Sequence, residues 1–534
     1  MDNSRLLIAT LLCFALLIGW QSFSEYMGWT PPPAPPVPVE ESAPQPARPD
    51  APAPAPMAPV QRFAPTEGRD VRVDTPLYSA VFHTNGGVLQ SFTLKKYTES
   101  IGPDARPFNL ISPAAAGVAP MGLMINGAPS WNTGAWACEG DDLSLGEGQS
   151  GTLVFTGDVN GLRVTRSISF SADSYYLDER TTLSSETALP AQLSHTLALT
   201  SISGGGNYDI MSMAWDLNGS FKSENSTTTL TEEGLISSGD IWWAGLMSNY
   251  FLAAVVPDQG AQLVFKGRIL EPGGIWRVAV EQPAATVTPD APLTVHTGWW
   301  MGAKDRAMLK AAPNDLSAAM DMGIFTFLAV PLLWLLSFLQ SLVGNWGVAI
   351  ILLTILIKLV FWPLTRKSFK SMEKMKQIQP MMKQLQEKYG KDKEALSREM
   401  MQLYKTYGVN PMGGCLPILI QLPVFVALYQ ALLHSIELRH AAFITYLPFT
   451  DTLWLADLSV KDPFYITPLV MGATMFLQQW LSPAMGDPTQ RKMMMFMPLI
   501  FTVMFINFPS GLVLYWLVNN ILSIAQQWWT LRKV

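Results

Sequence analysis

The feature that most constrains the fold is a series of long apolar segments in the second half of the chain. Several of them reach the length of about 20 residues that a helix needs to cross a bilayer. A water-soluble domain rarely contains so many apolar runs in succession. We therefore predict a polytopic α-helical membrane protein, with spans at residues 345–365, 413–437, 463–481, 493–508 and 511–530.

The apolar segment before these spans, residues 316–344, is interrupted by Pro331. Only Ser341 to Gly344 separates its helical part from the next span, which leaves little chain for a reversed crossing. We predict that this segment is an interfacial helix on the outer face of the membrane. A crossing is the alternative, and it would invert the topology of the following spans.

The charge distribution indicates the orientation of the spans. Basic residues dominate from Arg366 to Lys405, and further basic residues lie at Arg491 and Lys492 and at the C-terminus. The positive-inside rule places these segments in the cytosol, so the loop His440–Asp462 faces outward. Residues 1–30 contain another apolar run, predicted to be a retained membrane anchor rather than a cleaved signal peptide. The chain then has six spans.

The region between the anchor and the membrane bundle has two parts. Residues 31–65 are rich in proline and alanine, which predicts an extended linker. Residues 66–315 contain short alternating segments separated by glycine-rich breaks, which is typical of an all-β sandwich. The run Leu77–His83 leads through Asn85-Gly86-Gly87 into another strand-like run, which predicts a hairpin. The acidic excess of this β domain favours a location outside the cytosol.

Residues 366–410 form the basic segment, and its apolar residues recur at three- and four-residue steps on both sides of Gly390. This pattern predicts a cytosolic hairpin of two antiparallel helices with a methionine-rich seam. The simplest interpretation is a solvated pair of helices whose charge sets the topology. The alternative is a contact surface for lipid head groups, the ribosome or a substrate. The predicted contact residues are Lys370, Lys374, Lys383, Lys388 and Arg398.

Polar residues within the spans collect near one depth. Lys358 is the only formal charge in the middle of its span, and it lies five residues before Pro363, roughly 8 Å from the cytosolic end at 1.5 Å per residue. Thr354 shares its helical face, and Gln421 lies at a similar depth in the next span. In the last span, polar residues recur every three or four positions: Trp516, Asn519 or Asn520, Ser523, and Gln526 or Gln527.

This asymmetry predicts a hydrated groove that is open to the cytosol and closed toward the outside. Polar groups persist in hydrocarbon where they face one another or a wet cavity. In such a groove, Lys358 would attract acidic groups of a hydrophilic polypeptide tail. Alternatively, the lysine stem reaches the cytosolic head groups and the amine has no role in a groove.

Two other classes of membrane protein are less well supported. A transporter or channel needs polar residues through the full thickness of the membrane, and the outer halves of these spans are mostly apolar. An intramembrane zinc protease needs the spacing His-Glu-x-x-His, which His434, Glu437 and His440 do not have. No residue pattern suggests a catalytic centre, a metal, a cofactor or nucleic-acid binding, so we do not expect an enzyme.

Three motifs resemble a known family. Asn410-Pro-Met-Gly-Gly-Cys-Leu-Pro-Ile-Leu-Ile-Gln-Leu-Pro-Val-Phe resembles the signature of the YidC/Oxa/Alb membrane protein insertases. Phe508-Pro-Ser-Gly-Leu-Val-Leu-Tyr-Trp and Trp362-Pro-Leu-Thr are similar to two further stretches typical of that family. The resemblance covers roughly residues 316–530. The anchor, linker and β domain resemble the layout of the long, Gram-negative form.

The resemblance implies an insertase and chaperone for nascent membrane proteins. It implies a five-helix core with a cytosol-open hydrophilic groove, no use of ATP, and cooperation with the Sec translocon and its accessory subunits in the inner membrane. It also implies a periplasmic domain of β-supersandwich type, similar to galactose mutarotases.

The resemblance also assigns roles to individual positions. Lys358 stands where the family usually has arginine, and lysine keeps the charge but loses the planar fork. Thr354 and Trp516 match substrate-contacting positions, and Gln421 matches a groove-lining position. The sequence has no long basic tail after Lys533, so we expect only weak ribosome contact, through the hairpin and short loops.

Overall fold

The computed structural model describes residues 57, 61–64, 67–102, 104–203, 209–270, 274–390, 392–408, 416–481 and 488–531, and of 393, 416–420, 488–494 and 531 only the backbone. The predicted anchor 1–30 and nearly all of the linker 31–65 lie outside the described residues. So do the first residues of the motif that begins at Asn410, and the C-terminal residues after Leu531. Residues 56–534 form one compact unit.

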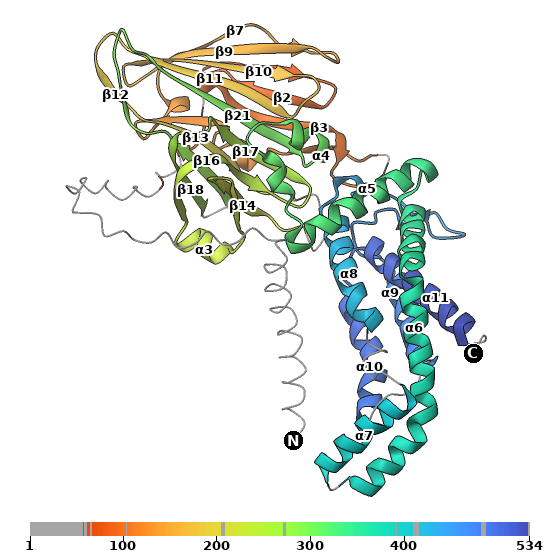
Figure 1. The fold of residues 1–534 in the computed structure, drawn as a ribbon. Helices are drawn as coiled ribbons and strands as arrows, with labels where there is room; N and C mark the ends of the chain where they lie inside the picture. The colour runs from red at the N-terminus through yellow and green to blue at the C-terminus, as the bar shows by residue number, and fades with distance from the viewer. Residues whose placement is uncertain are drawn as a thin grey trace, which may run out of the picture. The chain divides into compact units, whose positions relative to one another are not determined.

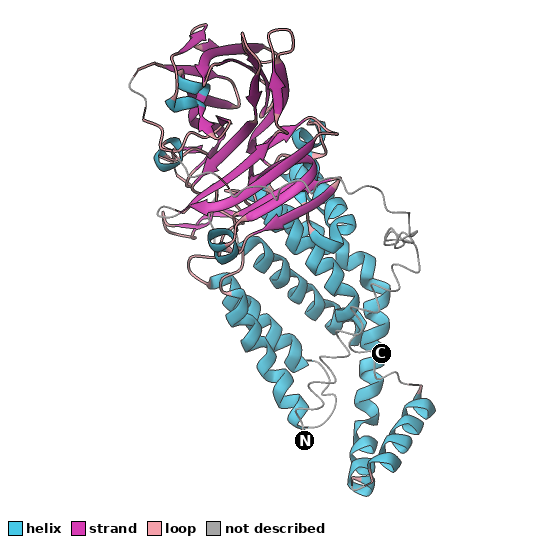
Figure 2. Ribbon diagram, turned by 90° about the vertical axis from the view of Figure 1, so that its left-hand side faces the viewer, coloured by secondary structure: helices cyan, strands magenta, loops and turns pink. Residues whose placement is uncertain are grey.

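The β domain contains two main sheets (Figures 1 and 2). The smaller has the order β4 (Pro107–Asn109), β3 (Val88–Thr98), β2 (Tyr78–His83), β1 (Asp70–Asp74), β8 (Leu143–Ser144). The larger has the order β6 (Ala128–Pro129), β5 (Gly122–Ile125), β13 (Leu193–Leu199), β19 (Ile275–Glu281), β18 (Gln262–Leu270), β16 (Leu235–Met247), β17 (Phe251–Pro257), β21 (Leu293–Ala303), β11 (Tyr176–Ser184), β10 (Leu162–Ser171), β9 (Ser150–Val159), β7 (Trp136–Glu139).

Smaller elements complete the domain. They are a hairpin of β14 (Ser212–Leu217) and β15 (Ser220–Glu224) beside β16, a pair of β12 (Leu189–Ala191) and β20 (Ala285–Val287), and the helices α2 (Pro113–Ala116), α3 (Thr227–Glu232) and α4 (Arg306–Ala311). Strand β16 joins two parts of the large sheet, because its first half pairs with β18 and its second half with β17.

Aromatic side chains pack the small sheet against the large one. The ring of Phe82 in β2 lies 6.2 Å from that of Phe155 in β9 and 5.6 Å from that of Phe170 in β10. Tyr78 and Tyr175 approach to 6.4 Å in the same core. Because the buried faces of two sheets meet, the region is a β-sandwich, as the alternating sequence pattern predicted.

The predicted hairpin is confirmed, and β10 shows the alternating exposure that the short alternating segments predicted. β2 and β3 pair antiparallel with Tyr78 opposite Leu94, and a 3₁₀ turn over Asn85–Gly87 connects them. Gly86 adopts φ 75°, a conformation that favours glycine. In β10, exposure alternates with a two-residue period, so that one face enters the core.

A charged group lies in the middle of this core. Arg166 of β10 and Glu179 of β11 are both fully buried and form two hydrogen bonds, of 2.8 and 2.7 Å. Arg166 also donates to the carbonyl oxygens of Gly86 and Gly87, and Glu179 accepts from the Trp299 indole at 2.7 Å. Burial raises the pKa of Glu179, but the charge and hydrogen bonds of Arg166 bring it below its usual value.

Two histidines of the β domain are expected to make its free energy of unfolding depend on pH in opposite directions. His195 is buried beside Trp299, and burial lowers its pKa to about 4. The unfolded chain therefore binds a proton first, so stability is present above about pH 6.5 and is lost as the pH falls toward 4. The loss amounts to roughly 3 kcal/mol, and His195→Leu should abolish it, as urea titrations of a fragment covering residues 67–315 would show.

His296 is expected to have the opposite effect on the pH dependence of stability, because its pKa is raised. Burial lowers its pKa, but hydrogen bonds of 2.6 Å to Asp258 and 2.5 Å to Asp178 raise it overall. Its contribution to stability is therefore present below about pH 6.5 and is lost as the pH rises through the raised pKa. In the same titrations, His296→Gln should reduce stability at acidic pH and have little effect at high pH. Parallel pH profiles of both variants and the parent would contradict this assignment.

The second half of the described chain is helical (Figure 1). Among its described residues, two helices, Gly323–Val343 and Trp346–Tyr389, are long and apolar enough to cross a membrane, and Gln421–His434 and Met495–Phe505 are shorter apolar helices. The elements are α5 (Thr326–Val343), α6 (Trp346–Tyr389), α7 (Lys393–Tyr407), α8 (Leu416–His434), α9 (Ile466–Leu481), α10 (Pro488–Phe505) and α11 (Ser510–Leu531).

The segment predicted to be interfacial forms α5, preceded by short 3₁₀ turns at Leu316–Met320 and Gly323–Phe325. Gly344 closes α5 in a left-handed conformation, and the Asn345 side chain caps α6 by accepting from the Val348 amide. The chain therefore changes direction within two residues. Figure 1 shows α5 running across α6 and α8 rather than parallel to them.

The basic segment folds as a hairpin of two helices. The first is not separate from the preceding span, because α6 continues as one helix through Pro363 and Pro380. Met375 and Ile378 are buried against Leu403 and Tyr404 of α7. This apolar contact lies at the predicted methionine-rich seam.

Helices α9 and α10 pack closely at a glycine. A Cβ atom added at Gly472 would lie 2.1 Å from the hydroxyl oxygen of Thr502. We expect Gly472→Leu to separate the two helices and to destabilise the bundle by about 1–3 kcal/mol. Thermal unfolding in detergent would measure this effect. Ala473→Leu, at the adjacent exposed position, is the matched control and should change stability by less than about 0.5 kcal/mol.

Candidate polar site between the membrane helices

The polar residues of three helices lie at a common distance from one end of the bundle. Each of three polar residues lies about 18–20 Å along its helix from one helix end, at 1.5 Å per residue. That end is the start of α6 for Lys358, the end of α8 for Gln421 and the start of α11 for Ser523. These three helix ends lie at the same end of the bundle, because the loop that follows α8 forms hydrogen bonds with the starts of α6 and α11. The structure thus brings the predicted polar positions to one level.

Lys358 is half-buried, and its amine donates a 2.7 Å hydrogen bond to the Ser523 hydroxyl. Ser523 is buried and donates in turn to the Asn519 carbonyl oxygen at 2.7 Å. Among the described residues no carboxylate forms an ion pair with Lys358. The charge therefore has a neutral partner in the resting structure, which leaves it available to an acidic group.

The polar face of α11 connects to the other helices. Gln421 of α8 donates to the Asn519 side chain, and Asn520 donates to Thr474 of α9 at 3.4 Å. Gln526 donates to Thr365 of α6 at 2.5 Å. Asn519, Asn520, Ser523 and Gln526 are all at least nine-tenths buried. The predicted stripe is thus a set of interhelical hydrogen bonds, with α11 at its centre.

Two predicted site residues lie outside this hydrogen-bonded set. Thr354 is buried at 1 % exposure and donates to the Ile350 carbonyl of its own helix at 2.7 Å. Trp516 packs edge-on against Phe425 at 4.7 Å and contacts Phe501 and Phe505. Three aromatic rings thus lie beside Trp516, at the end of the polar stripe in which the sequence pattern placed it.

The aromatic cluster of Phe425, Phe501, Phe505 and Trp516 joins α8, α10 and α11 on the outer side of Asn519. Sequence reasoning missed it, although Phe501 and Phe505 are one helical turn apart and Trp516 begins the polar stripe. Asn507 is a polar residue near this cluster in sequence; it lies in the turn after α10 and is exposed. The cluster therefore lies between Asn519 and the ends of the helices that the loop after α8 joins.

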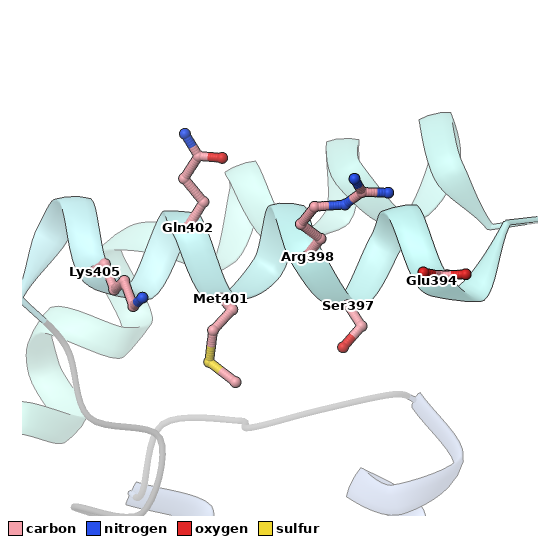
Figure 3. A pocket seen from close by; sticks show the side chains of 6 residues that line it. All are labelled: Glu394, Ser397, Arg398, Met401, Gln402 and Lys405. Atoms are coloured by element: carbon pink, nitrogen blue, oxygen red, sulfur yellow. The ribbon is translucent and has the colours of Figure 1, made fainter.

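The predicted hairpin residues Lys370, Lys374, Lys383, Lys388 and Arg398 are all exposed. A surface hollow of about 640 Å³ lies along α7 and is lined by Glu394, Ser397, Arg398, Met401, Gln402 and Lys405. Figure 3 shows Met401 and Ser397 on the opposite side of α7 from Gln402 and Arg398. The hollow is thus lined by both basic and apolar side chains, which project from different sides of α7.

Comparison with known proteins gives the family. Residues 70–335 match the family described as the YidC periplasmic domain, and residues 338–534 match the 60Kd inner membrane protein family. The membrane protein insertase YidC of Nitratidesulfovibrio vulgaris (strain DP4) is 56 % identical over the full length of both chains. The chain belongs to the YidC family of membrane protein insertases. The YidC of Lawsonia intracellularis is 51 % identical, again over both full chains.

The chain is also similar to a solved YidC structure, the active insertase with its first transmembrane domain resolved. That likeness has 18 % sequence identity and a TM-score of 0.36, and it covers 88 % of this chain and 94 % of the other. Family membership makes this chain an inner membrane protein with a periplasmic domain, and an insertase rather than an enzyme. The β domain is that periplasmic domain.

Proposed function

We propose that the polar level around α11 is the surface along which the hydrophilic tail of a nascent membrane protein enters from the cytosol. The observation that carries this proposal is the set of hydrogen bonds that join α6, α8 and α9 to α11 at one depth, closed outward by aromatic rings. Each of these bonds offers donors and acceptors that a polypeptide backbone can use instead. A tail that exchanges bonds in this way enters hydrocarbon depth without leaving its own polar groups unsatisfied.

In this mechanism, the positive charge of Lys358 attracts acidic residues of the substrate tail. Its amine is held by Ser523 and faces no carboxylate among the described residues, so an acidic tail residue gains a charge partner. Coulomb attraction is stronger where water is scarce, which makes one charge effective at this depth. Gln421, Asn519, Asn520 and Ser523 exchange hydrogen bonds with the tail. Thr354 and Trp516 contact the apolar part of the substrate as it moves toward lipid.

The topology that fits this proposal has six spans. The N-terminal anchor, α6, α8, α9, α10 and α11 cross the membrane, and α5 lies on its outer surface. The transverse course of α5 and the tight turn at Gly344 support this assignment. The hairpin of α6 and α7 and the C-terminus are then in the cytosol, in agreement with the positive-inside rule.

The cytosolic hairpin is proposed as the contact for the ribosome and for lipid head groups. Its exposed lysines and Arg398 supply positive charge, and Met401 supplies adaptable apolar surface in the hollow on α7. Cooperation with the Sec translocon and its accessory subunits is proposed from the motifs that the chain shares with its family. Neither contact requires a cofactor or a metal.

Photo-crosslinking tests the entry path. A photoreactive amino acid at Gln421 or Trp516 should crosslink to a stalled nascent membrane protein with an acidic N-terminal tail. Thr354 as a third position reports whether substrate reaches the buried turn of α6. Leu469 is the matched control, because it is an exposed apolar residue of α9 with no part in the polar level.

Equal crosslinking from Leu469 and Gln421 would show that the substrate passes along the lipid-facing surface. In that case the polar level is structural and the proposed path is wrong. Hydrophilic solute flux through the protein in liposomes would instead favour a channel. The aromatic cluster makes such flux unexpected, because it closes the outer side of the polar level.

A further inference from the structure

The loop between α8 and α9, residues 435–462, is called the outer loop here, and it contacts several separate elements. Its Phe443 carbonyl accepts from the Asn345 side chain at the start of α6 at 3.0 Å. Its Val460 and Leu458 carbonyls accept from the amides of Ser510 and Gly511 at the start of α11. The outer loop thus fastens the outer ends of the helices to one another.

Asp462 extends the same arrangement to α9. One carboxylate oxygen accepts from the Thr467 amide at 2.7 Å and from the Thr467 hydroxyl at 2.8 Å. The other accepts from the Trp454 indole at 2.9 Å. The carboxylate therefore caps the first turn of α9 and holds it against the outer loop.

The β domain meets the outer loop at Arg439. The guanidinium donates a 2.7 Å hydrogen bond to the Thr98 carbonyl of β3, and its carbon lies 5.3 Å from the ring centre of Phe108 and 5.4 Å from that of Phe251. Those rings are stacked on each other at 4.3 Å. A cation held over two aromatic rings and a carbonyl, at 7 % exposure, is a specific contact rather than chance proximity.

Polar contacts surround Arg439 on both sides. The Thr98 hydroxyl lies 3.2 Å from Nδ1 of His440, and the Tyr250 hydroxyl bonds to Ser459. On the β-domain side, the buried amine of Lys304 donates to the Ser248 carbonyl at 3.2 Å, which fixes the turn that carries Tyr250. Buried polar groups with matched partners indicate a defined interface between the domain and the loop.

We propose that Arg439 docks the periplasmic domain on the outer loop in the working protein, and that this docking stabilises the contacts that hold the outer ends of α6, α9 and α11 together. Arg439 is thus a positioning residue for the closed outer end of the bundle. The inference that this end must stay closed during insertion rests on the proposed function. The docking itself does not.

Hydrogen exchange of the full-length protein in nanodiscs tests the docking. Arg439→Gln should speed exchange of the Ser510, Gly511 and Phe443 amides about tenfold or more, because it removes a charge-assisted hydrogen bond and two cation–π contacts. Arg439→Lys keeps the charge without the planar fork and should give a smaller increase. Lys461→Gln is the matched control, since Lys461 lies on the same loop over Tyr465 and should leave exchange unchanged.

Unchanged exchange in Arg439→Gln would overturn the docking proposal. Amides of the β10–β11 pair in the same sample report global unfolding, and Phe108→Leu, which removes one ring from the β-domain side, should reproduce the local effect if Arg439→Gln unfolds throughout. Slow exchange in both Arg439→Gln and Phe108→Leu would contradict the docking but would not bear on the proposed path of the substrate tail. Failure of the photo-crosslinks from Gln421 would likewise leave the exchange result unaffected.

Discussion

Replacing Lys358 by alanine is expected to reduce insertion of substrates with acidic translocated tails by about tenfold, and of uncharged tails by less than about twofold. The amine is the charge at the polar level, and it donates a hydrogen bond to the Ser523 hydroxyl, so its removal eliminates the attraction but few structural contacts. Protease protection of the translocated tail, in vesicles with equal amounts of each variant, measures the effect.

Two substitutions separate charge from packing. Lys358→Arg should keep most of the activity, because the charge is retained and the family usually carries arginine at the matching position. Lys358→Met keeps an unbranched apolar stem and should fail like alanine. Lys370→Ala removes the same charge from an exposed hairpin position and is the matched control. Normal insertion of acidic tails by Lys358→Ala at parental abundance would remove Lys358 from the mechanism.

Local periodicity predicted the parts of the fold that depend on neighbouring residues. The β2–β3 hairpin, the alternation of β10 and the seam between α6 and α7 each follow from spacing of two, three or four positions. The common depth of Lys358, Gln421 and Ser523 could also be predicted from the sequence, because distance along a helix is proportional to residue number. The hydrogen-bond partners of these residues could not be predicted in this way.

Contacts between distant segments left no periodic signal. Arg439 and Thr98 are separated by 341 positions, and nothing in the outer-loop sequence indicates a partner in β3. Trp516 was assigned to the polar stripe because it falls in register with Asn519 and Ser523. Register fixes the helical face but not the neighbours, and Phe425 and Phe505 occupy the space beside it.

One tertiary feature did leave a signal in the sequence. In β10, Val164, Arg166 and Ile168 share the inward face, so a charged side chain occupies a core position. A buried arginine requires a carboxylate nearby, and Glu179 lies on β11 directly opposite Ile168, diagonal to Arg166, whose own register partner is Thr181. The alternation thus places Arg166 in the core, whereas its pairing with Glu179 and the Trp299 contact depend on the full topology.

Glu179→Ala is expected to destabilise the periplasmic domain by about 3–5 kcal/mol, because it leaves the Arg166 charge buried without its partner. The variant also removes the acceptor of the Trp299 indole and frees the arginine that holds the Gly86 and Gly87 carbonyls. Urea titration of a fragment covering residues 67–315 measures the free energy of unfolding directly.

The double variant Arg166→Met/Glu179→Leu should recover much of that loss, because apolar side chains of similar volume need no charge partner in a core. Asp74→Ala is the surface control. It breaks the Lys95–Asp74 pair, whose side chains are 37 % and 45 % exposed, and should cost less than about 1 kcal/mol. A double variant as unstable as Glu179→Ala would show that the Arg166 hydrogen bonds to the Gly86–Gly87 turn, rather than charge compensation, govern the stability of this core.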